Sequence, residues 1–198
     1  MSGPDSPDTL TTRASLARFT GEAGDAAGAR DQFAALLPVY ERARGPEHPE
    51  TLATIRADLA RFTGEAGDAA GARDQYTALL PVVKRVFGPD HPEVLSDRGN
   101  LARFTGEAGD PAAARDESAA LLPVSEQVLG PEHPNTLITR ACLARFTGEA
   151  GDPAGARDQL AVLLPVMERV LGSQHPYTLA AQSNLAEWTH ATEQPQTS

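Results

Sequence analysis

The feature that most limits the fold of this chain is a ten-residue block that occurs four times without change. The block Leu-Ala-Arg-Phe-Thr-Gly-Glu-Ala-Gly-Asp begins at Leu16, Leu59, Leu101 and Leu143, and a degenerate fifth copy begins at Leu185. Successive copies are 43, 42, 42 and 42 residues apart. A fixed period of this length predicts a solenoid, in which each unit buries its apolar face only against its neighbours.

Each repeat contains the signals for two helices and two turns. The block ends in a Gly-Asp pair, in which the glycine can end one helix and the aspartate can cap the next. The second turn, Gly-Pro-Glu-His-Pro at residues 45–49 and its later variants, supplies a glycine for a helix end and a proline for a first turn. We expect the histidine of this turn to cap the following helix, and Ser6 to do so in the first copy.

These signals predict an all-α fold, a solenoid of four antiparallel helix pairs followed by a C-terminal capping helix. The pairs are expected at residues 7–48, 49–91, 92–133 and 134–175, and the capping helix at residues 176–191. Residues 1–6 and 192–198 are expected to be flexible ends.

Two irregularities lie within the predicted helices. Each second helix contains a proline, at Pro38, Pro81, Pro123 and Pro165. Because proline removes a hydrogen bond inside a helix, each segment is expected to kink there, or else to form two short helices. The first helix of the second repeat has one extra residue near Ile55, which predicts a π-type bulge or a shifted helix start.

The third repeat has serines where the first repeat has large side chains. Ser118 and Ser125 take the places of Phe33 and Tyr40. Loss of a large buried side chain forgoes roughly 1.5–3 kcal/mol. We therefore expect the third repeat to be the least stable, or the gap to be a pocket for a partner's side chain.

The first helix has two apolar stripes, since successive residues are rotated by about 100°. One stripe contains Leu10, Ala14, Ala17 and Gly21, and the other contains Thr12, Leu16, Phe19 and Ala23. This pattern predicts a helix that is packed on two sides. The small-residue stripe has no visible cover in the sequence, so we expect it to be exposed unless an upstream domain or another protomer packs on it.

Between the two stripes lies a polar sector that is expected to face a groove. Its candidate binding residues are an arginine column, Arg18, Arg61, Arg103 and Arg145, and a varying column, Ser15, Asp58, Asn100, Cys142 and Asn184. A second varying column contains Thr11, Ala53, Ser96, Ile138 and Ala180. The arginines either grip carboxylates or carbonyls of a bound segment, or pair with the glutamate four residues later in their own helix. The varying residues either set specificity or have drifted since duplication.

A separate arginine column lies on the far side of the same helices. It contains Arg13, Arg56, Arg98 and Arg140. We expect these guanidinium groups to bridge to carboxylates of the second helices or the linkers, and their stems to cover apolar surface.

The sequence resembles a known repeat family in four features. These are the Leu-Ala of each first helix, the glycine that ends it, an early alanine of the second helix, such as Ala29 and Ala72, and the Gly-Pro-x-His-Pro linker. The chain resembles a tetratricopeptide-repeat array of the 42-residue kinesin-light-chain-like type, and is similar to repeats attached to bacterial signalling ATPases. The resemblance implies a right-handed superhelix whose first helices line a concave groove for extended peptides or partner segments. The asparagines that such helices place before Leu-Ala are present only at Asn100 and Asn184.

Composition excludes several other classes of function. The chain has 17 basic and 27 acidic residues, a formal charge of −10, which argues against nucleic-acid or anionic-membrane binding. Its only cysteine, Cys142, favours a cytoplasmic location, and the repeated histidines are too widely spaced to share a metal ion. No catalytic or cofactor-binding motif is present.

The sequence therefore predicts a non-enzymatic scaffold, without cofactor or metal, that binds a protein or peptide segment in its groove. One alternative is a self-associating or spacer module that stacks through its terminal helices. Another is the sensor arm of a larger signalling ATPase.

Overall fold

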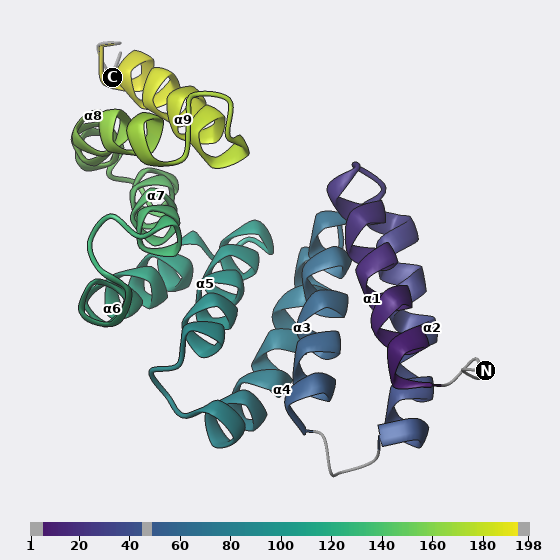
Figure 1. Cartoon of the computed structure of the whole chain (residues 1–198). Coiled ribbons are helices and arrows are strands. Elements are labelled where there is room, and N and C mark those ends of the chain that lie inside the picture. The colour runs from purple at the N-terminus through teal and green to yellow at the C-terminus, as the bar shows by residue number, and fades with distance from the viewer. Residues whose placement is uncertain (1–5, 45–48, 194–198) are drawn as a thin grey trace. The chain divides into compact units, whose positions relative to one another are not determined.

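The computed structural model describes residues 6–44 and 49–193, and within these ranges the chain forms nine α-helices and no strand. The helices are α1 (Pro7–Glu22), α2 (Ala26–Arg44), α3 (Pro49–Glu65), α4 (Ala69–Phe87), α5 (Pro92–Glu107), α6 (Pro111–Leu129), α7 (Pro134–Glu149), α8 (Pro153–Val170) and α9 (Pro176–Glu193) (Figure 1). The predicted all-α fold of four helix pairs and a further C-terminal helix is confirmed. The flexible ends predicted at 1–6 and 192–198 fall mostly outside the described ranges, although Ser6 caps α1 and α9 continues to Glu193.

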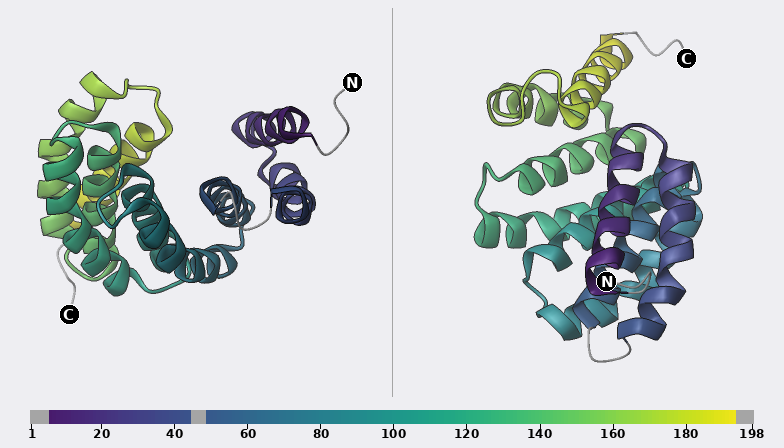
Figure 2. Two further views of the ribbon diagram at one scale, coloured as in Figure 1. Left: turned by 60° about the horizontal axis from the view of Figure 1, so that its bottom comes forward. Right: turned by 45° about the vertical axis from the view of Figure 1, so that its right-hand side comes forward.

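The helices group into two compact units, divided after Phe104 near the end of α5. In unit 1, α1 packs beside α2, and α3 packs against both α2 and α4 (Figure 1; Figure 2). In unit 2, α7 packs against α6 and α8, and α9 packs against α8. Consecutive helices are therefore spatial neighbours within each unit, which is the arrangement of a repeat protein.

The turns between paired helices follow the Gly-Asp signal of the sequence. Gly67 has a φ of +101°, a conformation that favours glycine, and it ends α3. The carboxylate of Asp68 then accepts a hydrogen bond from the backbone N–H of Gly71 at 2.8 Å and so caps α4. The same local signals fix the bounds of the other pairs.

The linker histidines cap the first helices, as predicted. The Nδ1 atoms of His91, His133 and His175 accept hydrogen bonds from the backbone N–H two residues later, at 3.2, 3.2 and 3.3 Å. Ser6 performs this role for α1 by accepting from the N–H of Thr9. His48 lies outside the described residues. These side chains satisfy helix ends and need no metal ion to explain their recurrence.

The core is built from aromatic rings that pack on glycines of the preceding first helix. Phe62 of α3 is fully buried, and its ring occupies the space where a side chain on Gly21 of α1 would lie. Phe62 also stacks on Phe33 of α2, with ring centroids 5.7 Å apart. The later copies of this contact are Phe104 on Gly64, Phe146 on Gly106 and Trp188 on Gly148. The glycine of each block thus makes room for the aromatic side chain of the next.

The first helix departs from the prediction of two packed sides. Its small-residue stripe is the buried one, since Leu10 and Ala17 have no exposed surface. Leu16 and Phe19 are 61% and 67% exposed, because no helix in the described part of the chain precedes α1 to cover them. The expectation that the small-residue stripe would be exposed is therefore wrong, and the opposite stripe is the exposed one.

Each second helix is continuous through its proline. Pro38, Pro81, Pro123 and Pro165 lie inside α2, α4, α6 and α8. The alternative of two short helices per segment is excluded. The apolar stripe on both sides of the proline packs on the same neighbours, which keeps one helix intact despite the lost hydrogen bond.

The extra residue of the second repeat lies in the first turn of α3. The helix has 17 residues where α1, α5 and α7 have 16, and all of them are α-helical, so the π-bulge prediction is wrong. From Ala53 onward its burial follows that of α5 and α7: Ala53 is 2% exposed and packs in the core, whereas Thr54 is half-buried. Thr54 therefore occupies the groove position that the sequence reading assigned to Ala53.

The serines of the third repeat are enclosed. Ser118 and Ser125 are only 1% and 2% exposed, and the Ser118 hydroxyl has no hydrogen-bond partner in the described structure. A site this closed does not offer a pocket to a partner. The prediction that the third repeat is the least stable remains a prediction.

Candidate functional site

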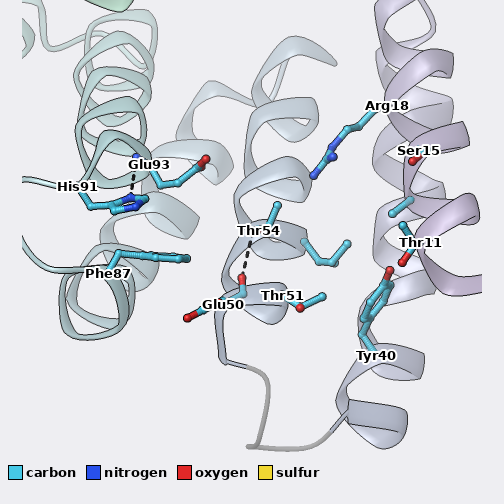
Figure 3. Close-up of a pocket in the computed structure, with 12 residues that line it drawn as sticks. Thr11, Ser15, Arg18, Tyr40, Glu50, Thr51, Thr54, Phe87, His91 and Glu93 are labelled. Carbon is cyan, nitrogen blue, oxygen red and sulfur yellow. Dashed lines mark hydrogen bonds between the residues drawn. The ribbon is translucent and has the colours of Figure 1, made fainter. Parts of the chain in front are cut away.

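Two adjoining hollows in unit 1 are the candidate site, and together we call them the unit 1 groove. The first lies between α1 and the start of α5 and has a volume of about 370 Å³. Figure 3 shows Arg18 extending from α1 towards α3, with Thr51 and Thr54 on α3 and His91 and Glu93 opposite. The remaining lining residues are Thr11, Ala14, Ser15, Tyr40, Glu50, Ile55 and Phe87.

The second hollow lies among α3, α4 and α5 and also has a volume of about 370 Å³. It shares Arg18, Thr54 and Glu93 with the first hollow. Its other lining residues are Ala57, Asp58, Arg61, Tyr76, Ser96, Asp97 and Asn100.

The unit 1 groove brings together five of the nine predicted site residues. They are Ser15, Arg18, Asp58, Arg61 and Asn100, from three different first helices. Arg103 lies in unit 1 without lining either hollow, and Arg145, Cys142 and Asn184 belong to unit 2. Contact between these residues and a partner remains a prediction.

The arginine column Arg18, Arg61, Arg103 and Arg145 pairs with carboxylates of the first helices, and Arg18 and Arg61 both pair with α3. Arg18 donates to Asp58 of α3, with Nε and Nη2 at 2.8 and 2.6 Å from Oδ2, and this hydrogen bond raises the pKa of Arg18. Arg61 lies 3.5 Å from Glu65 in its own helix and 3.9 Å from Asp58. The within-helix pairing predicted for Arg61 is present, whereas Arg18 pairs with the next first helix.

The same pairing continues along the column. Arg103 lies 3.9 Å from Glu65, and Arg145 lies 2.7 Å from Glu149 and 3.4 Å from Glu107. The guanidinium groups of Arg61, Arg103 and Arg145 also lie 4.0, 4.6 and 4.9 Å from the ring centroids of the phenylalanines that follow them. Arg18, Arg103 and Arg145 therefore join neighbouring first helices within each unit, whereas both ion pairs of Arg61 lie within α3.

On the far side, the second arginine column reaches the second helices, as predicted for two of its members. Arg56 lies 3.0 Å from Glu41 of α2, and Arg140 lies 2.7 Å from Glu126 of α6. These are structural pairs outside the groove.

Sequence reasoning missed Asp97. It occupies the position of Ile55 in α3 and Thr139 in α7, on the buried edge of the helix, and only 5% of its surface is exposed. Burial, and secondarily the carboxylates of Glu93 and Asp58, raises the pKa of Asp97 to about 7. An acid at a position that other copies fill with Ile or Thr is the signal that could have identified it.

Tyr76 forms the floor of the second hollow beside Asp97. Its hydroxyl donates to the backbone carbonyl of Ala57 at 3.0 Å, and burial raises its pKa. The ring stacks on Phe104, with centroids 6.1 Å apart. A hydrogen bond and a ring contact thus position the floor of the hollow, and its polar rim is formed by α3 and α5.

The family profile of the tetratricopeptide repeat matches residues 9–50, 52–93, 98–135 and 136–177. The chain belongs to the tetratricopeptide-repeat family. No curated protein sequence matches it. Tetratricopeptide repeats generally mediate protein–protein interactions, and scaffolds of the kinesin-light-chain-like type are typically non-enzymatic.

Solved structures of other tetratricopeptide-repeat proteins share the fold. A crystal structure of nearly identical TPR-like repeats of a kinesin-light-chain type from Podosopora anserina is 24% identical, covers 99% of this chain and 91% of its own, and has a TM-score of 0.71. BtubC (BKLC) from P. vanneervenii is 16% identical, covers 93% of this chain and 73% of its own, and has a TM-score of 0.72. At these identities the likeness concerns the fold.

The described part of this tetratricopeptide-repeat chain contains no helix that is both long and apolar enough to span a membrane. Over the same residues, no group of three or more His, Cys, Asp or Glu side chains is arranged to hold a metal ion.

Proposed function

We propose that this protein is an interaction scaffold that binds an extended segment of a partner in the unit 1 groove. One observation supports this most. Ser15, Ser96 and Asn100 line the groove, and their side chains make no hydrogen bond to any other residue in the described structure. Half-buried polar groups without internal partners are available to the backbone or side chains of a bound segment.

The ion pairs in the groove suggest different roles for the arginine column and the varying column. Because the arginines are occupied by Asp58 and Glu65, a bound carboxylate would have to displace an existing pair. The varying column, represented here by Ser15 and Asn100, is therefore the one proposed to select the partner. Arg18, which bridges α1 and α3 through Asp58, is proposed to fix the spacing of the helices that present it.

The test is selection of binders from a diverse displayed peptide library against the wild type and two variants. Thr54→Trp places a large side chain where the two hollows meet, because Thr54 lines both. Thr77→Trp is the matched control, since Thr77 is exposed on α4. Each threonine donates to the carbonyl four residues earlier, so both variants lose the same local bond.

Peptides that bind the wild type and Thr77→Trp but not Thr54→Trp would support the proposal, provided that circular dichroism shows all three folded. If no peptide is recovered, or if the recovered peptides bind Thr54→Trp equally well, the groove is not the receptor.

Self-association is a second candidate function, and the exposed Leu16 and Phe19 favour it. Two large apolar side chains that are 61% and 67% exposed on one helix are typical of an interaction surface. Sedimentation of the wild type and of Phe19→Ser over a range of concentrations tests this function. A mass that rises with concentration only in the wild type would support stacking through α1, and a constant monomer mass would eliminate it.

A further inference from the structure

The positive charges that line the second hollow are already paired, whereas not all of its negative charges are. Arg18 lies 2.6 Å from Asp58, and Arg61 is shared between Asp58 and Glu65. These contacts leave Asp97 and Glu93 as lining carboxylates without an ion pair in the described structure. The hollow therefore has an excess of negative charge.

Asp97 is the buried member of this excess. With 5% of its surface exposed, it accepts no hydrogen bond from any residue that the structure describes. The charges that act on it are those of Glu93 and Asp58, and Tyr76, Arg18 and Arg61 line the same hollow. An ionised carboxylate without a partner is costly at a buried position, unless a ligand supplies the missing charge.

The fold itself does not require a carboxylate at this position. Ile55, Thr139 and Ala181 occupy it in other repeats and are 2%, 6% and 2% exposed. An apolar or small side chain therefore packs equally well at this edge of the helix. The packing of α5 therefore does not account for the acid of the third repeat.

We propose that the second hollow of the unit 1 groove binds a cationic side chain of the partner, lysine or arginine, through the carboxylate of Asp97. The inference rests on the proposed function of the groove and names the chemistry of its ligand. Glu93 supplies a second negative charge at the rim, and Asn100 and Ser96 supply hydrogen-bond acceptors beside the cationic group. A volume of about 370 Å³ accommodates the end of either side chain.

The probe is the capped peptide acetyl-Ala-Ala-Lys-Ala-Ala-amide, titrated into the whole ¹⁵N-labelled chain and followed by NMR at pH 8. The matched probes contain norleucine or glutamate in place of lysine. We expect saturable shifts of amides around Asp97 and at least tenfold tighter binding of the lysine peptide than of the norleucine peptide. Because Asp97 must be ionised, binding is expected to be about tenfold weaker at pH 6.

Three variants separate the role of Asp97 from a general effect of charge or folding. Two variants replace Asp97, and Asp97→Thr gives α5 the residue that α7 has at this position. Both Asp97→Asn and Asp97→Thr should bind the lysine peptide no more tightly than the norleucine peptide. Asp74→Asn is the control, because Asp74 is an exposed acid on α4 and its removal changes the net charge equally. This variant should keep the preference.

Equal binding of the lysine and norleucine peptides to the wild type would overturn the inference. So would an undiminished preference in both Asp97 variants, or displacement of the lysine peptide by millimolar Mg²⁺, which would mark a metal site. Library peptides that depend on Thr54 without a lysine preference would leave the groove as a receptor and remove the cationic subsite. A lysine preference without any library binder would keep the subsite and remove the extended-segment receptor.

Discussion

Phe19 in α1 and Phe62 in α3 occupy the same place in identical ten-residue blocks, yet 67% of Phe19 is exposed and Phe62 is fully buried. The difference comes from the preceding first helix. Phe62 has Gly21 and Phe33 to pack on, whereas no described helix lies before α1. The converse case is Ile55 and Asp97, which differ in chemistry but occupy equivalent buried positions. In this chain, whether a side chain is buried depends on which helices flank it. The free energy gained or lost on burial depends on which residue occupies the position.

The largest difference in stability is expected between alanine substitutions of the two phenylalanines. Phe62→Ala is expected to lower the free energy of unfolding by about 3–5 kcal/mol, because it leaves a cavity against Gly21 and Phe33. Phe19→Ala should change it by no more than about 0.5 kcal/mol. Urea unfolding of both variants measures the difference. Similar values for the two would contradict the role assigned to position in the array.

The next largest effect is on the pH dependence of stability, in which Asp97 should differ from the uncharged residues at the equivalent positions of the other repeats. Its pKa is about 7 in the folded chain and near 3.9 when unfolded, so the folded state holds the extra proton between these values. Stability should therefore fall as pH rises from about 4 to about 7 and then level off. The difference between Asp97→Thr and the wild type should grow over this window by on the order of 2–4 kcal/mol. Parallel stability curves for the two proteins would show that Asp97 is not desolvated.

Replacing a glycine that packs against an aromatic ring should destabilise the chain more than replacing a glycine that does not. Gly64→Ala is expected to destabilise unit 1 by about 1–3 kcal/mol, because the new methyl group meets the ring of Phe104. Gly71→Ala is the matched control: its new methyl group meets the movable carboxylate of Asp68 and not a ring, and in the third repeat Ala113 occupies this position with its N–H still bonded to Asp110. The control should be neutral or slightly stabilising. Thermal unfolding distinguishes the two, and equal losses would mean that the ring shifts freely.

The smallest effect is expected in the third repeat. Ser118→Ala removes a buried hydroxyl that has no partner, and should stabilise the chain by about 1 kcal/mol. In the wild type, amide hydrogen exchange should be faster in α6 than in α4, where Tyr76 and Val83 fill the equivalent places. Exchange at equal rates in the two helices, or a destabilised Ser118→Ala, would show that α6 is better packed than its serines imply.

Much of the fold could be predicted from the sequence because its signals are local. The Gly67-Asp68 pair ends one helix and caps the next through contacts within a few residues, and His91 caps α5 in the same way. Such contacts depend on spacing along the chain alone. The helix bounds, the pairs and the capping role of the histidines therefore followed from the sequence.

Much of the candidate site could not be predicted because it depends on contacts between helices. Arg18 and Glu22 are four residues apart, which suggests a pair, but Asp58 of the next first helix binds Arg18 in the folded chain. The isolation of Asp97 is visible only once Arg61 is seen to be occupied elsewhere. The sequence alone also misplaced the extra residue of α3, since an insertion can be absorbed wherever the core tolerates it.

The contact of aromatic ring with glycine also governs how such a chain can change its length. A duplicated 42-residue unit carries both the ring that fills the preceding glycine and the glycine that receives the next ring, so insertion among the existing repeats creates no new type of interface. α9 breaks this rule, because it has Trp188 to fill Gly148 but His190 where a glycine would receive another ring. A further unit packed on α9 would therefore meet His190 where every earlier first helix presents a glycine.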